Sequence, residues 1–255
     1  MEEKERYKHL NKYLKEKFGE RTLKICIDGG FTCPNRDGTI SSGGCIFCSE
    51  RGSGDHIKFN DISLQVENYF KSYKSERANK FIAYFQNYTN TYDTIENLKL
   101  KYDSALINKN IVALAIATRP DCITDEICQL LKTYSDKYYV WVELGLQTSN
   151  ETTGILINRG YSNIQFTKAV NLLNKYNIDI VTHIMVGLPN ENFQDIINNV
   201  DFINSHNIQG LKIHSTYVVK HTILANMLLN GTYIPITLEY YLKCLTYILT
   251  HISPN

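Results

Sequence analysis

Apolar runs alternate with amphipathic segments six times along the chain, and each run ends in polar residues. The runs are short and nearly continuous, which is typical of strands buried on both faces. They are Leu23–Ile27, Phe81–Phe85, Ile111–Ala117, Tyr139–Leu146, Ile178–Val186 and Leu211–Val219. The segments with helical spacing are Leu64–Ser75, Thr94–Asn108, Asp125–Tyr134, Ile164–Tyr176, Phe193–His206 and Leu238–His251. This alternation predicts an α/β protein with a parallel sheet, as an open doubly wound sheet or a partial barrel.

One more helix is expected before the first strand. Tyr7, Leu10, Leu14 and Phe18 recur at helical spacing between Lys and Glu residues, and Gly19 follows them. This pattern predicts an amphipathic helix that ends at the glycine.

Polar residues gather just past the predicted strand ends, where both candidate folds build their sites. Four further polar residues, Glu143, His183, Lys212 and His214, lie within the predicted strands. Burying such groups is costly unless they are paired. They either line a substrate cavity or form a satisfied polar network, and the sequence leaves both alternatives open.

The loop after the first predicted strand holds three cysteines. Eleven residues separate Cys33 from Cys45, and two separate Cys45 from Cys48. Three thiolates converging on a metal centre would order a loop so rich in Gly, Asn, Asp and Ser. A structural zinc site and an ordinary four-iron cluster each take four ligands, so three thiolates would leave one iron open for chemistry.

Other interpretations of these cysteines remain. Zinc completed by Cys26 or His56 is one, and free thiols are another. The remaining cysteines, Cys122, Cys128 and Cys244, show no partner spacing and are interpreted as ordinary thiols.

Composition narrows the class of protein. The 255 residues contain 43% hydrophobic and 21% charged residues, as expected for a globular protein of one large or two small domains. A net charge of +1 gives no global argument for nucleic-acid binding. The start is charged, no apolar stretch is long enough for a membrane span, and seven cysteines without a secretion signal indicate a reducing compartment. We therefore expect a cytoplasmic protein without a membrane partner.

The cysteine loop, with Phe47 directly before the last cysteine, resembles the cluster-binding loop of the radical S-adenosylmethionine (radical SAM) superfamily. Its long first gap, its Cys-Pro-Asn-Arg-Asp-Gly start and its Gly-Gly-Cys resemble the narrower YhcC-like family. That family is related to the Elongator catalytic subunit and to oxygen-independent coproporphyrinogen III oxidase. The resemblance runs from about Tyr13 to the chain end and favours a partial (β/α)6 TIM-like barrel of the radical SAM type.

The resemblance also implies a chemistry. Cys33, Cys45 and Cys48 would bind a [4Fe-4S] cluster whose open iron chelates S-adenosylmethionine. One electron, from a reductant such as flavodoxin or ferredoxin, would cleave the sulfonium and generate a 5′-deoxyadenosyl radical. That radical would abstract a hydrogen atom from an unknown substrate, with tRNA and a porphyrin as candidates by analogy.

Five further residues receive roles from the resemblance. Phe47 would contact the adenine, Gln147 would bind the ribose hydroxyls, and Gln86 or backbone carbonyls would contact the amino group. Arg159 would pair with the methionine carboxylate, with a surface salt bridge as the alternative. His183 falls where some relatives place a ribose-binding Asp, with a core histidine as the alternative.

Two other functions stay open, and departures from the family pattern leave room for the first of them. Tyr161 stands where close relatives usually have His, and His183 replaces the Asp. The first alternative is a cluster-binding scaffold or electron carrier without turnover, and the second is a zinc-stabilised RNA-binding module.

The sequence also predicts how the chain is divided. We expect a helical extension over 1–20, the barrel over 21–220, and an incomplete helical segment over 221–255.

Overall fold

The computed structural model describes residues 7–52 and 61–253. Its centre is one six-stranded, fully parallel sheet in the order β1-β2-β3-β4-β5-β6. The strands are β1 (Thr22–Ile27), β2 (Lys80–Phe85), β3 (Ile111–Thr118), β4 (Tyr139–Gln147), β5 (Asp179–Val186) and β6 (Gly210–Ser215). A doubly wound sheet reverses its strand order partway, whereas a barrel keeps strands in chain order. The order confirms the partial barrel.

The predicted helices all form. They are α1 (Leu10–Phe18), α2 (Ile62–Lys71), α3 (Ile95–Ala105), α4 (Asp125–Ser135), α6 (Asn163–Lys175), α7 (Phe193–Asn204) and α9 (Leu238–His251). The sequence did not predict α5 (Glu151–Leu156), α8 (Ile223–Leu229) or the 3₁₀ turns Ser75–Arg77 and Pro120–Cys122. These elements are too short to show a helical period. None of the helices described is long and apolar enough to cross a bilayer.

The prediction for the last strand was too long. β6 ends at Ser215, not at Val219. The apolar residues beyond it belong to a loop. Val218 packs against the cluster around Ile46, and Tyr217 and Val219 line a cavity. These contacts, and not burial in a strand, account for their apolar side chains.

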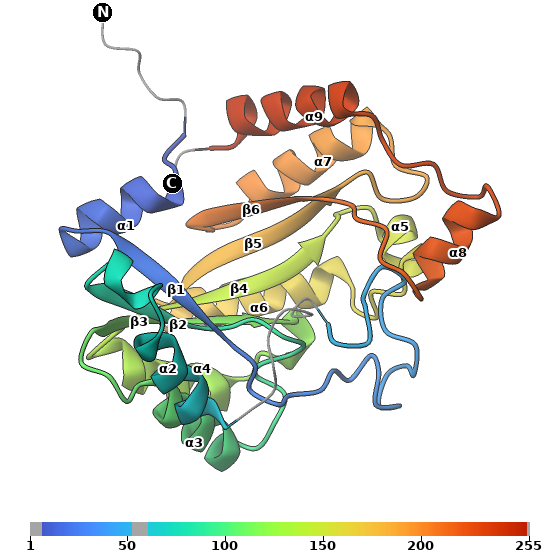
Figure 1. Ribbon diagram of the computed structural model, residues 1–255. Helices are drawn as coiled ribbons and strands as arrows, with labels where there is room; N and C mark the ends of the chain where they lie inside the picture. The colour runs from blue at the N-terminus through green and yellow to red at the C-terminus, as the bar shows by residue number, and fades with distance from the viewer. Residues whose placement is uncertain (1–6, 53–60, 254–255) are drawn as a thin grey trace, which may run out of the picture.

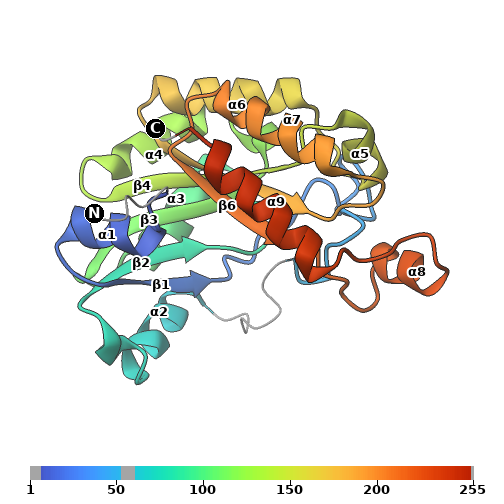
Figure 2. The ribbon, with the colours of Figure 1, turned by 90° about the horizontal axis from the view of Figure 1, so that it is seen from above.

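The two faces of the sheet are covered differently. On one face the sheet packs against helices such as α4, α6 and α7, which lie side by side over it (Figure 2). On the other face a smaller apolar cluster fills the half-barrel, built from Ile82, Tyr84, Ala113 and Trp141 with Leu14 of α1. Figure 1 shows α1 at the end of the sheet opposite to the strand tips. α1 thus closes the amino-terminal end of the half-barrel.

Local signals in the sequence explain α1. The His9 side chain accepts a hydrogen bond from the Asn11 amide at the start of the helix. Gly19 adopts φ 79° at its end and donates to the Lys15 carbonyl at 2.7 Å. This left-handed conformation is inexpensive only for glycine, so the helix ends there.

We expect Leu14→Ala to lower the free energy of unfolding by about 2–5 kcal/mol, because it leaves a cavity in the inner cluster. Leu14 is 3% exposed, whereas Leu10 of the same helix is 43% exposed. The matched variant Leu10→Ala should therefore change stability by only about 0.5 kcal/mol. Urea unfolding of both variants measures the difference, and equal small losses would show that α1 does not close the barrel.

Candidate functional site

The cysteine loop follows β1 and is cross-braced by its own side chains. The Arg36 guanidinium donates to the carbonyls of Cys48 at 2.8 Å and Ser49 at 2.5 Å. The Arg36 amide donates to the Cys33 carbonyl at 2.8 Å, and the Cys48 amide donates to the Cys45 carbonyl at 3.0 Å. These bonds form two tight turns, one starting at the first cysteine and one joining the last two.

The loop is also tied to the segment before α6. The Asn35 side-chain amide donates to the Asn158 carbonyl at 2.6 Å, and the Asn158 side chain donates to the Gly44 carbonyl at 2.7 Å. The Ile46 amide donates to the Ile157 carbonyl at 3.1 Å. The sequence suggested that a metal centre would have to order this loop. Protein contacts from a distant segment contribute that order as well, which the sequence reasoning missed.

Cys33, Cys45 and Cys48 are partly buried and line one cavity of about 390 Å³. Burial, together with the charges that Cys48 and Cys33 would carry, raises the pKa of the Cys45 thiol to about 12. Metal binding therefore has to displace a firmly held proton at this thiol. The cavity lies at the carboxyl ends of the strands, where Figures 1 and 2 place the cysteine loop together with α5 and α8.

The donor set fits an iron–sulfur cluster better than a single ion. Among residues 7–52 and 61–253, no three Cys, His, Asp or Glu side chains are grouped closely enough to hold one metal ion. A zinc site needs four ligands around one ion, whereas the thiolates of a [4Fe-4S] cluster each bind a different iron. Of the candidate fourth ligands for zinc, Cys26 is an exposed thiol on β1, and His56 lies outside the described residues.

Four of the five other predicted cofactor residues line the same cavity. Phe47 lies within the second cysteine turn, Gln86 directly follows β2, Gln147 ends β4 and His183 lies on β5. Gln147 adopts φ 66°, and the pairing of β4 with β5 shifts register beside it. Such a bulge re-aims a side chain at the end of a strand. The structure thus brings these four residues together with the cysteines.

Arg159 does not lie in this cavity. Its side chain is fully buried, and all five of its N–H donors are engaged. They bind the carbonyls of Leu146, Thr148 and Tyr161, the Glu151 carboxylate and the Asn163 side chain at 2.6 to 3.2 Å. In this arrangement no Arg159 donor is left for the methionine carboxylate, and its pairing with that group stays a prediction. The alternative, a surface salt bridge, is right about the ion pair with Glu151 but wrong about its place, because the Arg159 guanidinium is buried.

Arg119 lines the cavity instead. It follows β3, and three of its five N–H groups bind the Asp121 carboxylate and the Arg159 carbonyl at 2.8 to 3.0 Å. Asp121 raises the pKa of Arg119 despite its burial, so the cation is retained. The sequence placed Arg119 at a strand end but offered no signal that it, rather than Arg159, reaches the cavity.

Tyr161, which replaces the His of close relatives, has a structural role here. It is buried, and its hydroxyl donates to the Gly145 carbonyl at 2.8 Å. The guanidinium groups of Arg119 and Arg159 lie 4.9 and 4.7 Å from its ring centroid. Tyr161 therefore supports the backbone beside Gln147, and its ring packs close to both arginines.

Deeper in the half-barrel, Glu143 of β4 accepts hydrogen bonds from five side chains. The donors are Lys24 and Trp141 at Oε1, and Tyr84, His183 and Lys212 at Oε2, with distances of 2.7 to 3.3 Å. We call these six residues the floor network. Burial alone would raise the pKa of Glu143, but the hydrogen bond from His183 and the charges of Lys24 and Lys212 hold it well below the usual range. The carboxylate is charged and satisfied, so the polar-network interpretation of Glu143 agrees with the structure.

Part of the floor network also faces the cavity. Tyr84, Glu143, His183 and Lys212 line it, and so does His214 of β6. The rings of His183 and His214 lie 5.1 Å apart. Burial lowers the pKa of both, to about 4 for His214, so His214 is neutral at neutral pH. A carboxylate only accepts hydrogen bonds, so the neutral His183 carries its proton on Nε2 and donates to Glu143.

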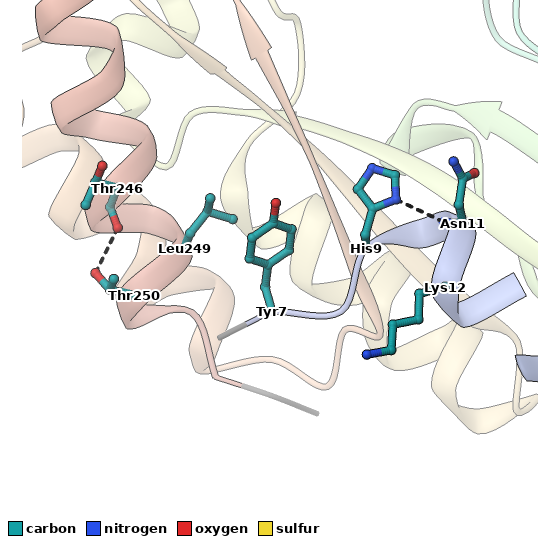
Figure 3. A pocket seen from close by; sticks show the side chains of 7 residues that line it. All are labelled: Tyr7, His9, Asn11, Lys12, Thr246, Leu249 and Thr250. Atoms are coloured by element: carbon teal, nitrogen blue, oxygen red, sulfur yellow. Dashed lines mark hydrogen bonds between the residues drawn. The ribbon is translucent and has the colours of Figure 1, made fainter. Parts of the chain in front are cut away.

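A second cavity lies between the chain before α1 and α9 (Figure 3). Its volume is about 630 Å³, larger than that of the cysteine cavity. It is lined by Tyr7, His9, Asn11, Lys12, Thr246, Leu249 and Thr250, which include no cysteine and none of the predicted site residues. Volume alone therefore does not identify the functional site.

Two sequence relatives match nearly all of the chain. YtqA of Bacillus subtilis is 40% identical over 85% of this chain and 68% of its own length. YhcC of Escherichia coli is 34% identical over 95% of this chain and 78% of its own length. These matches confirm the resemblance to YhcC-like proteins.

The fold and the family model point the same way. The solved structure of an Elp3 from Methanocaldococcus infernus superposes with a TM-score of 0.67 at 21% identity. It covers 89% of this chain, while this chain spans 53% of that one. The Radical SAM superfamily model matches residues 33–203, and a Radical_SAM C-terminal domain model matches residues 208–255. The chain therefore belongs to the radical SAM superfamily, and this membership confirms the expected cofactors, a [4Fe-4S] cluster and S-adenosylmethionine.

Proposed function

We propose that this protein is an enzyme that cleaves S-adenosylmethionine reductively and abstracts a hydrogen atom from a substrate held over the floor network. One observation carries the proposal. The three loop cysteines, Phe47, Gln86 and Gln147 come from separate parts of the chain and line a single cavity. Polar groups at the carboxyl ends of barrel strands are where such folds perform catalysis.

The chain's own residues bind and orient the cofactors. When bound and reduced, the cluster and S-adenosylmethionine supply a hydrogen-abstracting 5′-deoxyadenosyl radical. Cys33, Cys45 and Cys48 hold the cluster through their thiolates. The ring of Phe47 offers the adenine an apolar surface, and the Gln147 carboxamide both donates to and accepts from a ribose diol.

The remaining polar ends of the cofactor need other partners. Gln86 directly follows β2 and lines the same cavity, where its carboxamide would contact the amino group. Arg119 replaces Arg159 as the partner of the methionine carboxylate, because its guanidinium lines the cavity. A guanidinium binds a carboxylate with directional, charge-assisted hydrogen bonds. His183 remains a candidate for the ribose through the ring nitrogen that does not bind Glu143.

An external one-electron donor is part of the proposal, such as a flavodoxin or a ferredoxin. The substrate is a separate question. tRNA is the first candidate to test, by analogy with the related Elongator subunit. The net charge of +1 adds no electrostatic argument for binding it.

The test is anaerobic reconstitution of the full chain with iron and sulfide, followed by dithionite and S-adenosylmethionine. We expect a brown protein that forms 5′-deoxyadenosine, at a rate that rises if tRNA is a substrate. Cys33→Ala, Cys45→Ala and Cys48→Ala should each abolish both colour and product, because each removes an iron ligand.

Cys26→Ala is the matched control, since Cys26 is exposed and outside the cavity lining. It should keep both colour and product. A colourless protein that holds zinc and loses it in Cys26→Ala would establish the zinc alternative. Colour without 5′-deoxyadenosine would identify a scaffold or electron carrier instead.

A further inference from the structure

The floor network contains more positive than negative charge. Glu143 is its single carboxylate, and two lysines bind it. The Lys24 amino group lies 2.7 Å from Oε1, and the Lys212 amino group lies 3.2 Å from Oε2. His183 and His214 beside them are neutral and do not change this charge balance. The closer lysine is enough to neutralise the carboxylate, so Lys212 is a surplus cation.

The two lysines differ in what they face. Lys212 lines the cavity and its side chain is 37% exposed, whereas Lys24 is not among the lining residues. Two of the three N–H groups of Lys212 bind the Tyr84 hydroxyl and Glu143, at 3.1 and 3.2 Å. The third N–H group is left to bind a ligand.

His214 lies beside this amino group on the cavity wall. Lys212 and His214 are two residues apart on β6, so their side chains project from the same face of the sheet. Both line the cavity. A neutral imidazole presents one donor and one acceptor, so His214 can add a second hydrogen bond to whatever the lysine binds.

Other charges around the cavity do not oppose an anion at this place. Glu143 is the one carboxylate among the described lining residues, and five donors surround it. Arg36 binds backbone carbonyls of the cysteine loop, and Arg119 is paired with Asp121. Of the lining cations, Lys212 is thus the one placed deep within the half-barrel and away from the loop.

The position separates this cation from the cysteines and Gln147. Lys212 pairs in register with His183, and His183 with Gly145, which lies two residues before the strand end at Gln147. The cysteines and Gln147 lie at or beyond the strand ends. Lys212 therefore lies below them, where a substrate rather than the cluster would reach.

We propose that Lys212 and His214 bind an anionic group of the substrate, a carboxylate or a phosphate. This inference rests on the proposed function, since it places the substrate in the same cavity. An anionic group at this position would neutralise the surplus charge of the floor network and satisfy the remaining lysine donor. Its charge would also favour one orientation of the substrate beneath the cofactor.

The test is calorimetric titration of the reconstituted full chain with inorganic phosphate and, separately, with acetate. Lys212→Met should weaken binding of the preferred anion by about tenfold or more, because a hydrogen bond to a charged group is lost. Lys24→Met is the matched control, since it removes the other lysine on the same carboxylate. It should weaken anion binding less than Lys212→Met does, because the surplus charge is lost while the Lys212 donor that binds the anion remains.

Further variants keep the test decisive. Lys212→Arg should retain binding, and His214→Phe should weaken it. If Lys212→Met does not fold, Lys212→Gln removes the charge while keeping polar contacts to Tyr84 and Glu143. Preference for phosphate over acetate, or the reverse, identifies the anionic group.

Several outcomes would overturn the inference. These are no measurable anion binding, equal loss in the Lys212→Met and Lys24→Met variants, or loss of anion binding when S-adenosylmethionine saturates the protein. The last result would assign Lys212 to the cofactor's own carboxylate. The titration requires no turnover, so anion binding and 5′-deoxyadenosine formation can fail independently, and each result tests its own proposal.

Discussion

Arg159→Met is expected to lower the free energy of unfolding by about 3–5 kcal/mol, as for the loss of one partner in a buried ionic network. The Arg159 side chain is fully buried, and its five hydrogen bonds join the end of β4, α5 and the start of α6. Removing it leaves the carbonyls of Leu146 and Thr148 without these donors in a dry environment. Unsatisfied buried acceptors cost stability because they have lost water as well.

The same substitution should also weaken binding of S-adenosylmethionine. Leu146 and Thr148 flank Gln147, whose φ of 66° is strained for a residue other than glycine. Arg159 holds the carbonyls on both sides of that residue at 2.9 and 2.6 Å. Without this support we expect Gln147 to relax and lose its orientation toward the cavity.

Two matched variants separate the charge from the geometry. Glu151→Gln removes only the charge of a partner whose side chain is 48% exposed, so its cost should be about 1 kcal/mol or less. Arg159→Lys keeps the charge but has three donors in place of five, so it should remain strongly destabilised. Denaturant unfolding gives the stabilities and equilibrium dialysis gives the affinity for S-adenosylmethionine. A cost for Arg159→Met no larger than that for Glu151→Gln would contradict the prediction.

Glu143→Leu is the second substitution with a large expected effect, a loss of about 3–5 kcal/mol. Glu143 is 2% exposed and is the common acceptor for Lys24, His183 and Lys212. Without the carboxylate, two lysine cations face each other with no counter-ion in the half-barrel. Both the loss of attraction and their repulsion destabilise the fold.

Glu143→Gln tests the charge alone, since it keeps the shape of the side chain. The folded-state pKa of Glu143 is lowered, so its contribution is fully present above the unfolded value of about 4 and is lost as the pH falls below it. The difference in stability between the wild type and Glu143→Gln should therefore be constant from pH 7 to pH 5 and shrink below about pH 4. Urea unfolding at a series of pH values measures it. A difference that does not change on acidification would show that the carboxylate charge is not what stabilises the network.

Much of the fold follows from local patterns. The runs around Ile111–Thr118 and Tyr139–Gln147 are too continuously apolar for anything but strands covered on both faces. The helices of the fold were predicted from their helical period, and the structure shows that Thr124, Ser162 and Asn192 cap three of them. α5 and α8 were missed because a helix of six or seven residues has fewer than two turns in which to show a period.

Part of the candidate site likewise follows from the sequence, and part of it depends on tertiary structure. The sequence alone determined the three cysteines, their spacing and the polar strand ends, because thiolate ligands and parallel strands constrain residues locally. Tertiary structure alone decided which arginine reaches the cavity. Arg119 and Arg159 both lie next to apolar segments of the sequence. Only the positions of distant partners decide that Arg159 is buried and binds backbone carbonyls, whereas Arg119 lines the cavity. The charge balance around Glu143 depends likewise on side chains from five different strands that meet at one point, which no single stretch of sequence can display.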